Sequence, residues 1–143
     1  MSVEAVLLPL FAQVALTFVL LFWMGYERLR AVRQGEVRAK DVALGEPNWP
    51  PRVLQIANSF HNQLQLPVLF YVLTILALGA RKADLLFVVM AWVFVATRVF
   101  HAVIHTTTNN VARRFYAFLA GAVMLSVMWA IFAVRIFVAP VTE

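Results

Sequence analysis

The sequence predicts an all-α integral membrane protein, a single domain over residues 1–143 built as a bundle of four transmembrane helices. Composition is the first reason: 63% of the residues are hydrophobic, 13% are charged, and the mean hydropathy is +0.82. Soluble domains of this size carry far more charge. Four long apolar runs are the second reason, because about 20 such residues cross the hydrocarbon core of a bilayer.

The first half of the chain should form two of these helices. The first is expected over residues 6–30, with Pro9 in its opening turn, where proline is tolerated. The linker is expected at 41–51, which holds one glycine and three prolines. The second helix, 52–79, is polar in its first half and apolar in its second. Pro67 lies at the junction and predicts a kink, because proline donates no backbone hydrogen bond.

The second half predicts a third helix over 83–105 and a fourth over 113–138. The turn between the second and third helices is short, so these two should be antiparallel neighbours. The third run is long enough to span only if Arg98 is allowed inside it. A charge within a bilayer is costly and marks a candidate functional site.

Basic residues predict the orientation of the chain in the membrane. Eight of them fall on one side, in the loop after the first helix and the turn before the fourth: Arg28, Arg30, Arg33, Arg38, Lys40, Arg52, Arg113 and Arg114. The opposite side has Arg81, Lys82 and Arg135. The positive-inside rule therefore predicts both termini on the non-cytoplasmic side. The net charge of +5 sits in short loops, so it indicates orientation and not a nucleic-acid partner.

The chain contains no cysteine. This excludes disulfides, thiolate metal sites and a cysteine nucleophile. Any thiol chemistry must therefore use a thiol that a ligand supplies.

Two rows of polar side chains fall inside the predicted spans. The amide row consists of Gln55, Asn58, Asn62 and Gln65, and the basic row of Arg98, His101 and His105. Spacings of three and four residues place each row on one helix face, and both rows fall in the cytoplasmic half. They predict a polar cavity for an anionic small molecule, with positive charge from Arg98, Arg114 and Arg30. The alternative is structural, since such amides also join helices, at about 0.6 kcal/mol each.

The histidines leave a second alternative open. His101 and His105 have the i, i+4 spacing of metal ligands, and His61 would make a third. Neither row contains a carboxylate to complete a metal site, so we predict no metal and expect histidines hydrogen-bonded within the bundle.

Residues 58–71, NSFHNQLQLPVLFY, resemble the second-helix signature of the MAPEG family, the membrane-associated proteins of eicosanoid and glutathione metabolism. Arg98, His101 and His105, followed by Arg114, resemble the third helix of that family and the start of its fourth. Length, helix number and predicted orientation agree with this resemblance, which covers nearly the whole chain.

The resemblance implies a homotrimer that binds glutathione between neighbouring subunits, in the cytoplasmic half of the membrane. It implies that Arg114 stabilises the glutathione thiolate as the catalytic residue, with Arg113 as the fallback. The other residues expected to bind the ligand are Arg30, Asn58, Asn62, Gln65, Arg98, His101 and His105.

Three positions depart from the family pattern. Gln65 stands where the family usually has a glutamate, Asn58 where an arginine is frequent, and His105 where a tyrosine is usual. The implied function is a membrane enzyme, glutathione transferase- or peroxidase-like, that conjugates or reduces a small lipophilic electrophile from the lipid bilayer, here in a bacterial inner membrane. The departures favour the alternative of a non-catalytic membrane subunit or a lipid- or partner-binding scaffold with the same fold. A haem or metal protein is the third hypothesis.

Overall fold

The computed structural model describes residues 1–45 and 47–138, so residue 46 of the expected linker and residues 139–143 of the expected domain lie outside the described residues. The helices are α1 (Val3–Arg33), α2 (Pro51–Asn62), α3 (Leu66–Gly79), α4 (Leu85–Thr106) and α5 (Val111–Phe137), with a short 3-10 turn at Ala39–Asp41. Taken together, α2 and α3 form one of four stretches that are long and apolar enough to cross a membrane. The chain is therefore an all-α integral membrane protein, as predicted.

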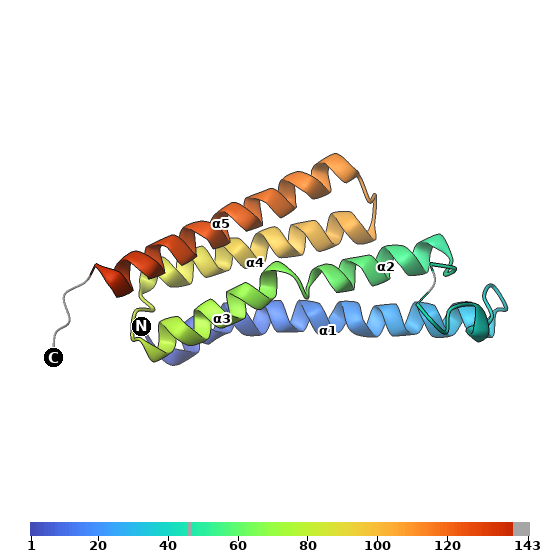
Figure 1. Ribbon diagram of the computed structural model, residues 1–143, viewed down its shortest axis with the longest axis horizontal. Coiled ribbons are helices and arrows are strands. Elements are labelled where there is room, and N and C mark those ends of the chain that lie inside the picture. Colours follow the sequence, from blue (N-terminus) through green and yellow to red (C-terminus); the bar gives the residue numbers. More distant parts are fainter. Residues whose placement is uncertain (46, 139–143) are drawn as a thin grey trace.

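The four spans alternate in direction along the bundle (Figure 1). α1 begins and α5 ends at one end, whereas the α1–α2 loop and the α4–α5 turn lie at the other. α1 packs against α2, α3 and α4, and α5 packs against α4 and α3. The polar first half of the second span and the end of α4 therefore share the same half of the bundle.

The predicted kink is a complete break, which separates α2 from α3. Pro67 has no N–H group to donate to the Gln63 carbonyl, and the backbone amide of Gln63 donates to the Phe60 carbonyl at 2.9 Å, three residues back, in the last turn of α2. The side chain of Gln63 is fully buried and accepts a hydrogen bond of 3.0 Å from Gln13 Nε2 on α1. This hydrogen bond holds the break against α1 in the middle of the bundle.

Capping residues set the starts of the last two helices. α4 begins at Leu85 and not at residue 83, because Asp84 accepts a hydrogen bond of 3.0 Å from the Phe87 amide. α5 begins at Val111, two residues earlier than expected, because Asn110 accepts one of 3.0 Å from the Arg113 amide.

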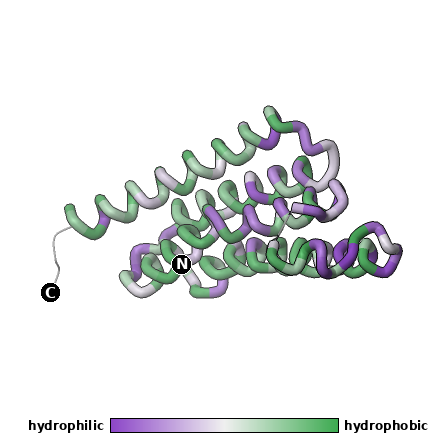
Figure 2. Tube along the Cα trace, turned by 45° about the vertical axis from the view of Figure 1, so that its right-hand side comes forward, coloured by the Kyte–Doolittle hydropathy of each residue, from purple (hydrophilic) through white to green (hydrophobic). Residues whose placement is uncertain are grey.

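The two halves of the bundle differ in polarity. In the half where α1 begins, an apolar core forms around Phe70 and Phe94, whose ring centroids lie 4.9 Å apart. This contact confirms that the second and third spans are neighbours. In Figure 2, hydrophilic residues are concentrated toward the end that holds the α1–α2 loop and the α4–α5 turn.

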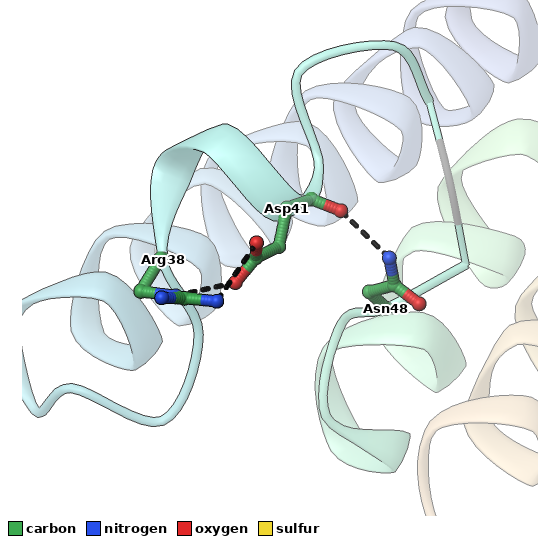
Figure 3. Close-up of polar contacts among 3 residues, drawn as sticks. All are labelled: Arg38, Asp41 and Asn48. Carbon is green, nitrogen blue, oxygen red and sulfur yellow. Dashed lines mark hydrogen bonds and ion pairs between the residues drawn. The ribbon is translucent and has the colours of Figure 1, made fainter.

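The α1–α2 loop is fixed by its own polar contacts (Figure 3). Arg38 forms an ion pair of 2.8 Å with Asp41, whose carbonyl accepts a hydrogen bond of 2.7 Å from Asn48 Nδ2. Arg52 then places its guanidinium 5.3 Å from the centre of the Trp23 ring, which ties the start of α2 to α1. These contacts hold the polar half of the second span in register with α1.

Candidate functional site

Arg98 is the centre of the polar cluster. It lies on α4 with no exposed surface, and its Nη2 donates a hydrogen bond to Asn62 Oδ1 at the end of α2. Its guanidinium carbon lies 5.6 Å from the centre of the Phe118 ring on α5. The prediction that Arg98 is buried and contacts the amide row is confirmed, and Arg98 joins three helices.

The hydrogen-bonding capacity of this cluster is only partly used. Among the described residues, Nε and Nη1 of Arg98 have no hydrogen-bond partner, and neither does Nδ1 of His101 or His105. The ion pairs within the described part of the chain are Arg38–Asp41 and Arg135–Asp84, so Arg98 belongs to none. A buried polar group without a partner costs about 1–3 kcal/mol, and a charged one more. The free N–H groups therefore favour an acceptor from outside the chain.

A cavity of about 230 Å³ lies next to two residues that contact Arg98. Its lining residues are Asn62, His101, Val111, Arg114, Phe115 and Phe118. Two of them, Asn62 and Phe118, also contact Arg98, so the guanidinium lies behind these two residues and does not itself line the cavity.

Arg114 brings a second positive charge to the same cavity. Its Nη1 donates to Asn109 Oδ1 in the α4–α5 turn. Asn109 has a φ of 50°, a left-handed conformation that asparagine tolerates better than most residues. The turn residue thus fixes the Arg114 side chain, whose charge has no carboxylate partner among the described ion pairs.

The amide row divides into two roles. Asn62 contacts Arg98 and donates from Nδ2 to Gln65 Oε1 at 3.1 Å, so Gln65 remains linked to the cluster although it lies in the helix break. Gln55 instead donates to the His105 carbonyl at 2.8 Å, which joins α2 to α4 as the structural interpretation expects. Asn58 is exposed.

Two predicted residues lie apart from the cavity within the subunit. Arg30 is exposed on α1 and lines a different cleft, with Glu27, Glu36 and Arg52. Arg113 is exposed, and its backbone amide donates to the Asn110 side chain that caps α5. Spacing along the helices alone could not predict which way the side chains of Arg30 and Arg113 point.

The histidine hypothesis is only half supported by the geometry. His101 and His105 lie edge to face, with ring centroids 5.4 Å apart. His61 is exposed and packs on Phe60. No three histidines, cysteines or carboxylates of the described chain come together as a metal-binding group, so the three-histidine set of the haem or metal alternative is not assembled within the subunit.

The sequence reasoning missed two residues on α5. Phe118 covers Arg98, and its i+4 spacing from Arg114 would have predicted a common face. Gly121 marks the close approach of α5 to α4, because a Cβ atom there would lie 2.7 Å from Thr97 Oγ1. A lone glycine within an apolar run is the only sequence signal for such an approach.

Fold and site together define a four-helix membrane protein with a cationic cavity walled by its second, third and fourth spans. The chain belongs to the MAPEG family, whose model matches residues 6–134. No curated protein and no solved structure matches the chain.

Proposed function

We propose that this chain is a membrane enzyme that binds glutathione or a related anionic thiol and transfers it to, or uses it to reduce, a small lipophilic electrophile. The observation that carries the proposal is the fully buried Arg98, whose N–H groups without partners lie behind two residues, Asn62 and Phe118, that line a cavity together with Arg114. Family membership supports the same ligand class, because proteins of the MAPEG family typically bind glutathione.

The residues around the cavity fit the two acidic parts of such a ligand. Arg98 would hold a carboxylate, because its guanidinium offers two unused donors in a site with little water. Arg114 would stabilise the thiolate, because it is the arginine that lines the cavity. Asn62 would orient the carboxylate and the thiolate of the ligand, since it lines the cavity and contacts Arg98 directly.

The chemistry then needs no nucleophile from the chain. Arg114 lowers the free energy of the thiolate after the thiol proton has passed to solvent. In conjugation, the thiolate sulfur forms a bond to the electrophilic carbon, and the leaving group departs with the electron pair of the broken bond. In peroxide reduction, two thiols become a disulfide while the O–O bond is cleaved to an alcohol and water. Phe115 and Val111 border the cavity and are exposed, so a lipophilic substrate can approach from the apolar side.

A homotrimer would complete this site. Phe115 and Val111 are 56% and 68% exposed, so the wall that α5 contributes has room for a neighbouring subunit. Arg30 lies on α1 away from the cavity of its own subunit, and a neighbouring cavity is where it would act. By the positive-inside rule, this end of the bundle faces the cytoplasm, in a bacterial inner membrane.

Ultraviolet difference spectroscopy of the purified protein tests the proposal. Adding glutathione should give the absorbance of a bound thiolate at a pH at which free glutathione is protonated. Arg114→Ala should abolish this signal, and Arg135→Met, at the opposite end of the bundle, should keep it. Absence of the signal in the wild type, together with absence of conjugating activity, would favour the scaffold alternative, which the departures at Gln65, Asn58 and His105 support.

A further inference from the structure

We propose that Asn109, in the turn between α4 and α5, is a positioning residue for the reaction. Its amide oxygen holds the Arg114 guanidinium without cancelling the positive charge that the thiolate needs. This inference rests on the proposed function and adds to it a residue that does not touch the thiol. The contact lies within one turn of one chain, so it does not depend on what a neighbouring subunit adds to the cavity.

The α4–α5 turn is attached to α2 through its backbone carbonyl groups. Arg52 Nη1 donates to the Thr106 carbonyl at 2.6 Å. Gln55 Nε2 donates to the carbonyls of His105 and Thr107, at 2.8 and 3.2 Å. The last carbonyls of a helix have no partner within that helix, so a guanidinium and an amide from a neighbouring helix suit them well. The turn therefore has a fixed place relative to α2.

Asn109 is held within this turn by its own backbone. Its amide donates to the Ile104 carbonyl at 2.7 Å, and its φ of 50° is left-handed. Asparagine and aspartate adopt this conformation more readily than other residues that carry a side chain, and glycine adopts it freely. A backbone fixed in this way limits the positions that the Asn109 amide oxygen can reach.

The Arg114 side chain meets Asn109 because side chains on a helix lean toward its N-terminal end. Arg114 is the fourth residue of α5, so it reaches back across the first turn, and its Nη1 donates to Asn109 Oδ1. A guanidinium has five N–H donors, and this hydrogen bond uses one of them. Val111 and Phe118, three residues before and four after Arg114, line the same cavity. The contact therefore holds Arg114 at the cavity and leaves donors for a ligand.

The neutrality of this acceptor matters for the chemistry. A carboxylate partner offsets the charge of an arginine, as Asp84 does for Arg135. Arg114 is held by an amide oxygen instead, and it belongs to neither of the ion pairs within the described residues. Its side chain is thus ordered before the thiol binds, and its charge remains available to a developing thiolate.

Substitutions in the turn separate the position of Arg114 from its charge. Asn109→Gly removes the acceptor but suits the left-handed backbone, so the thermal stability should change little. Asn109→Asp keeps the acceptor and tolerates the same backbone, but its carboxylate pairs with Arg114. Thr108→Gly is the control for a looser turn, because it changes an exposed residue and keeps Asn109. Asn110→Asp is the control for added charge, because it still caps α5.

Two quantities are measured on the full-length protein in detergent: kcat with glutathione and an aromatic halide, and the pH at which bound glutathione ionises, followed by thiolate absorbance. In Asn109→Gly, kcat should fall by about three- to tenfold, because a long side chain must then be ordered during the reaction. The ionisation should move to higher pH, and KM for glutathione should change less than kcat. Asn109→Asp should show larger changes in kcat and in the ionisation, because its carboxylate offsets the charge of Arg114. Both controls should resemble the wild type.

The outcomes separate the inference from the proposed function. If the wild type shows neither a bound thiolate nor activity, the proposed function and the inference are both overturned. If the wild type is active and Asn109→Gly matches it in kcat and in the ionisation, the inference is wrong while the proposed function stands. If Thr108→Gly loses as much as Asn109→Gly, the stiffness of the turn is responsible and the contact is not. Equal effects of Asn109→Asp and Asn110→Asp would likewise overturn the assignment to Asn109.

Discussion

The two arginines within the last two spans, Arg98 and Arg135, differ in their burial and in the partners of their charge. Arg135, on α5, lies where the bundle is partly exposed, donates to the Asp84 carboxylate at 2.7 Å, and donates again to the Lys82 carbonyl at 3.2 Å. Arg98, on α4, is fully buried, and its partner within the described chain is one neutral amide. The partly exposed arginine thus pairs with a carboxylate, and the buried one does not.

This difference is what we would expect between a structural arginine and the ligand-binding arginine that we propose. The Arg135–Asp84 pair is exposed to solvent, and pairs of that kind contribute about 0–1 kcal/mol. A buried charge without a counter-charge costs the free protein stability. Under the proposed function, an anion that binds beside Arg98 would offset this cost.

Replacing Arg98 should have the largest effect. In Arg98→Met, affinity for the thiol ligand should fall by about 2–5 kcal/mol, or roughly 30- to 5,000-fold, because a buried charged contact is lost. The thermal stability of the free protein should stay the same or rise, because an unpaired buried charge is removed. Titration calorimetry and thermal unfolding in the same detergent measure the two effects.

The matched control is Arg135→Met, which should leave ligand affinity unchanged. A loss of both stability and affinity in Arg98→Met, in proportion to each other, would mean that Arg98 is structural like Arg135.

Arg114 should affect the rate more than the affinity. Arg114→Ala should lower kcat by about 10²–10³, because it removes one electrostatic donor to the reacting thiolate. KM for the thiol should change less than in Arg98→Met, because the carboxylate contact remains. Arg113→Ala should lose far less activity, since that side chain does not line the cavity. Steady-state kinetics with an aromatic halide electrophile compares the two variants. A larger loss of kcat in Arg113→Ala than in Arg114→Ala would mean that Arg113 stabilises the thiolate.

Gly121 should control the distance between α4 and α5 beside Arg98. In Gly121→Ala the new Cβ meets Thr97 Oγ1, which donates to the Phe94 carbonyl at 2.6 Å. Overpacking of this kind costs about 1–3 kcal/mol. Gly25→Ala is the control: its Cβ meets nothing within 4 Å, so it should stabilise α1 by roughly 0.5–1 kcal/mol. Thermal unfolding that ranks the two variants equally would argue against a close contact at Gly121.

The Arg135–Asp84 pair should give the smallest effect. The Arg135 guanidinium holds the pKa of Asp84 below its usual range, so the pair stabilises the fold at neutral pH. This contribution should be lost as the pH falls below the ordinary aspartate value of about 4 and through the lowered pKa of the folded state. Asp84→Asn keeps a good helix cap and removes only the charge, at a cost of at most about 1 kcal/mol.

Unfolding at several pH values checks this expectation. The Asn variant should lack the part of the acid sensitivity that Asp84 contributes. An identical acid profile in both proteins would mean that the pair contributes nothing.

The sequence predicted the parts of this molecule that depend on one-dimensional patterns. Hydropathy predicted the four spans, Pro67 predicted a kink at the point where the structure has a break, and helical spacing predicted that Arg98 contacts the amide row, as it does at Asn62. The sequence could not predict how each helix is rotated about its axis, because packing between helices decides that. This is why Arg30 was expected at the cavity and lies apart from it within the subunit, while Phe118 was missed. The roles of Arg114 and of the other predicted site residues remain predictions.

The break between α2 and α3 affects how the second span can adapt to bilayers of different thickness. In a thinner membrane, a continuous helix would tilt as a whole. This tilt would displace Asn62 from its position beside Arg98. Here α3 can tilt on its own, while the hydrogen bond between Gln13 and Gln63 keeps the end of α2 attached to α1. We therefore expect the geometry around Arg98 to be largely independent of lipid chain length, so that the same protein can work across changes in membrane composition.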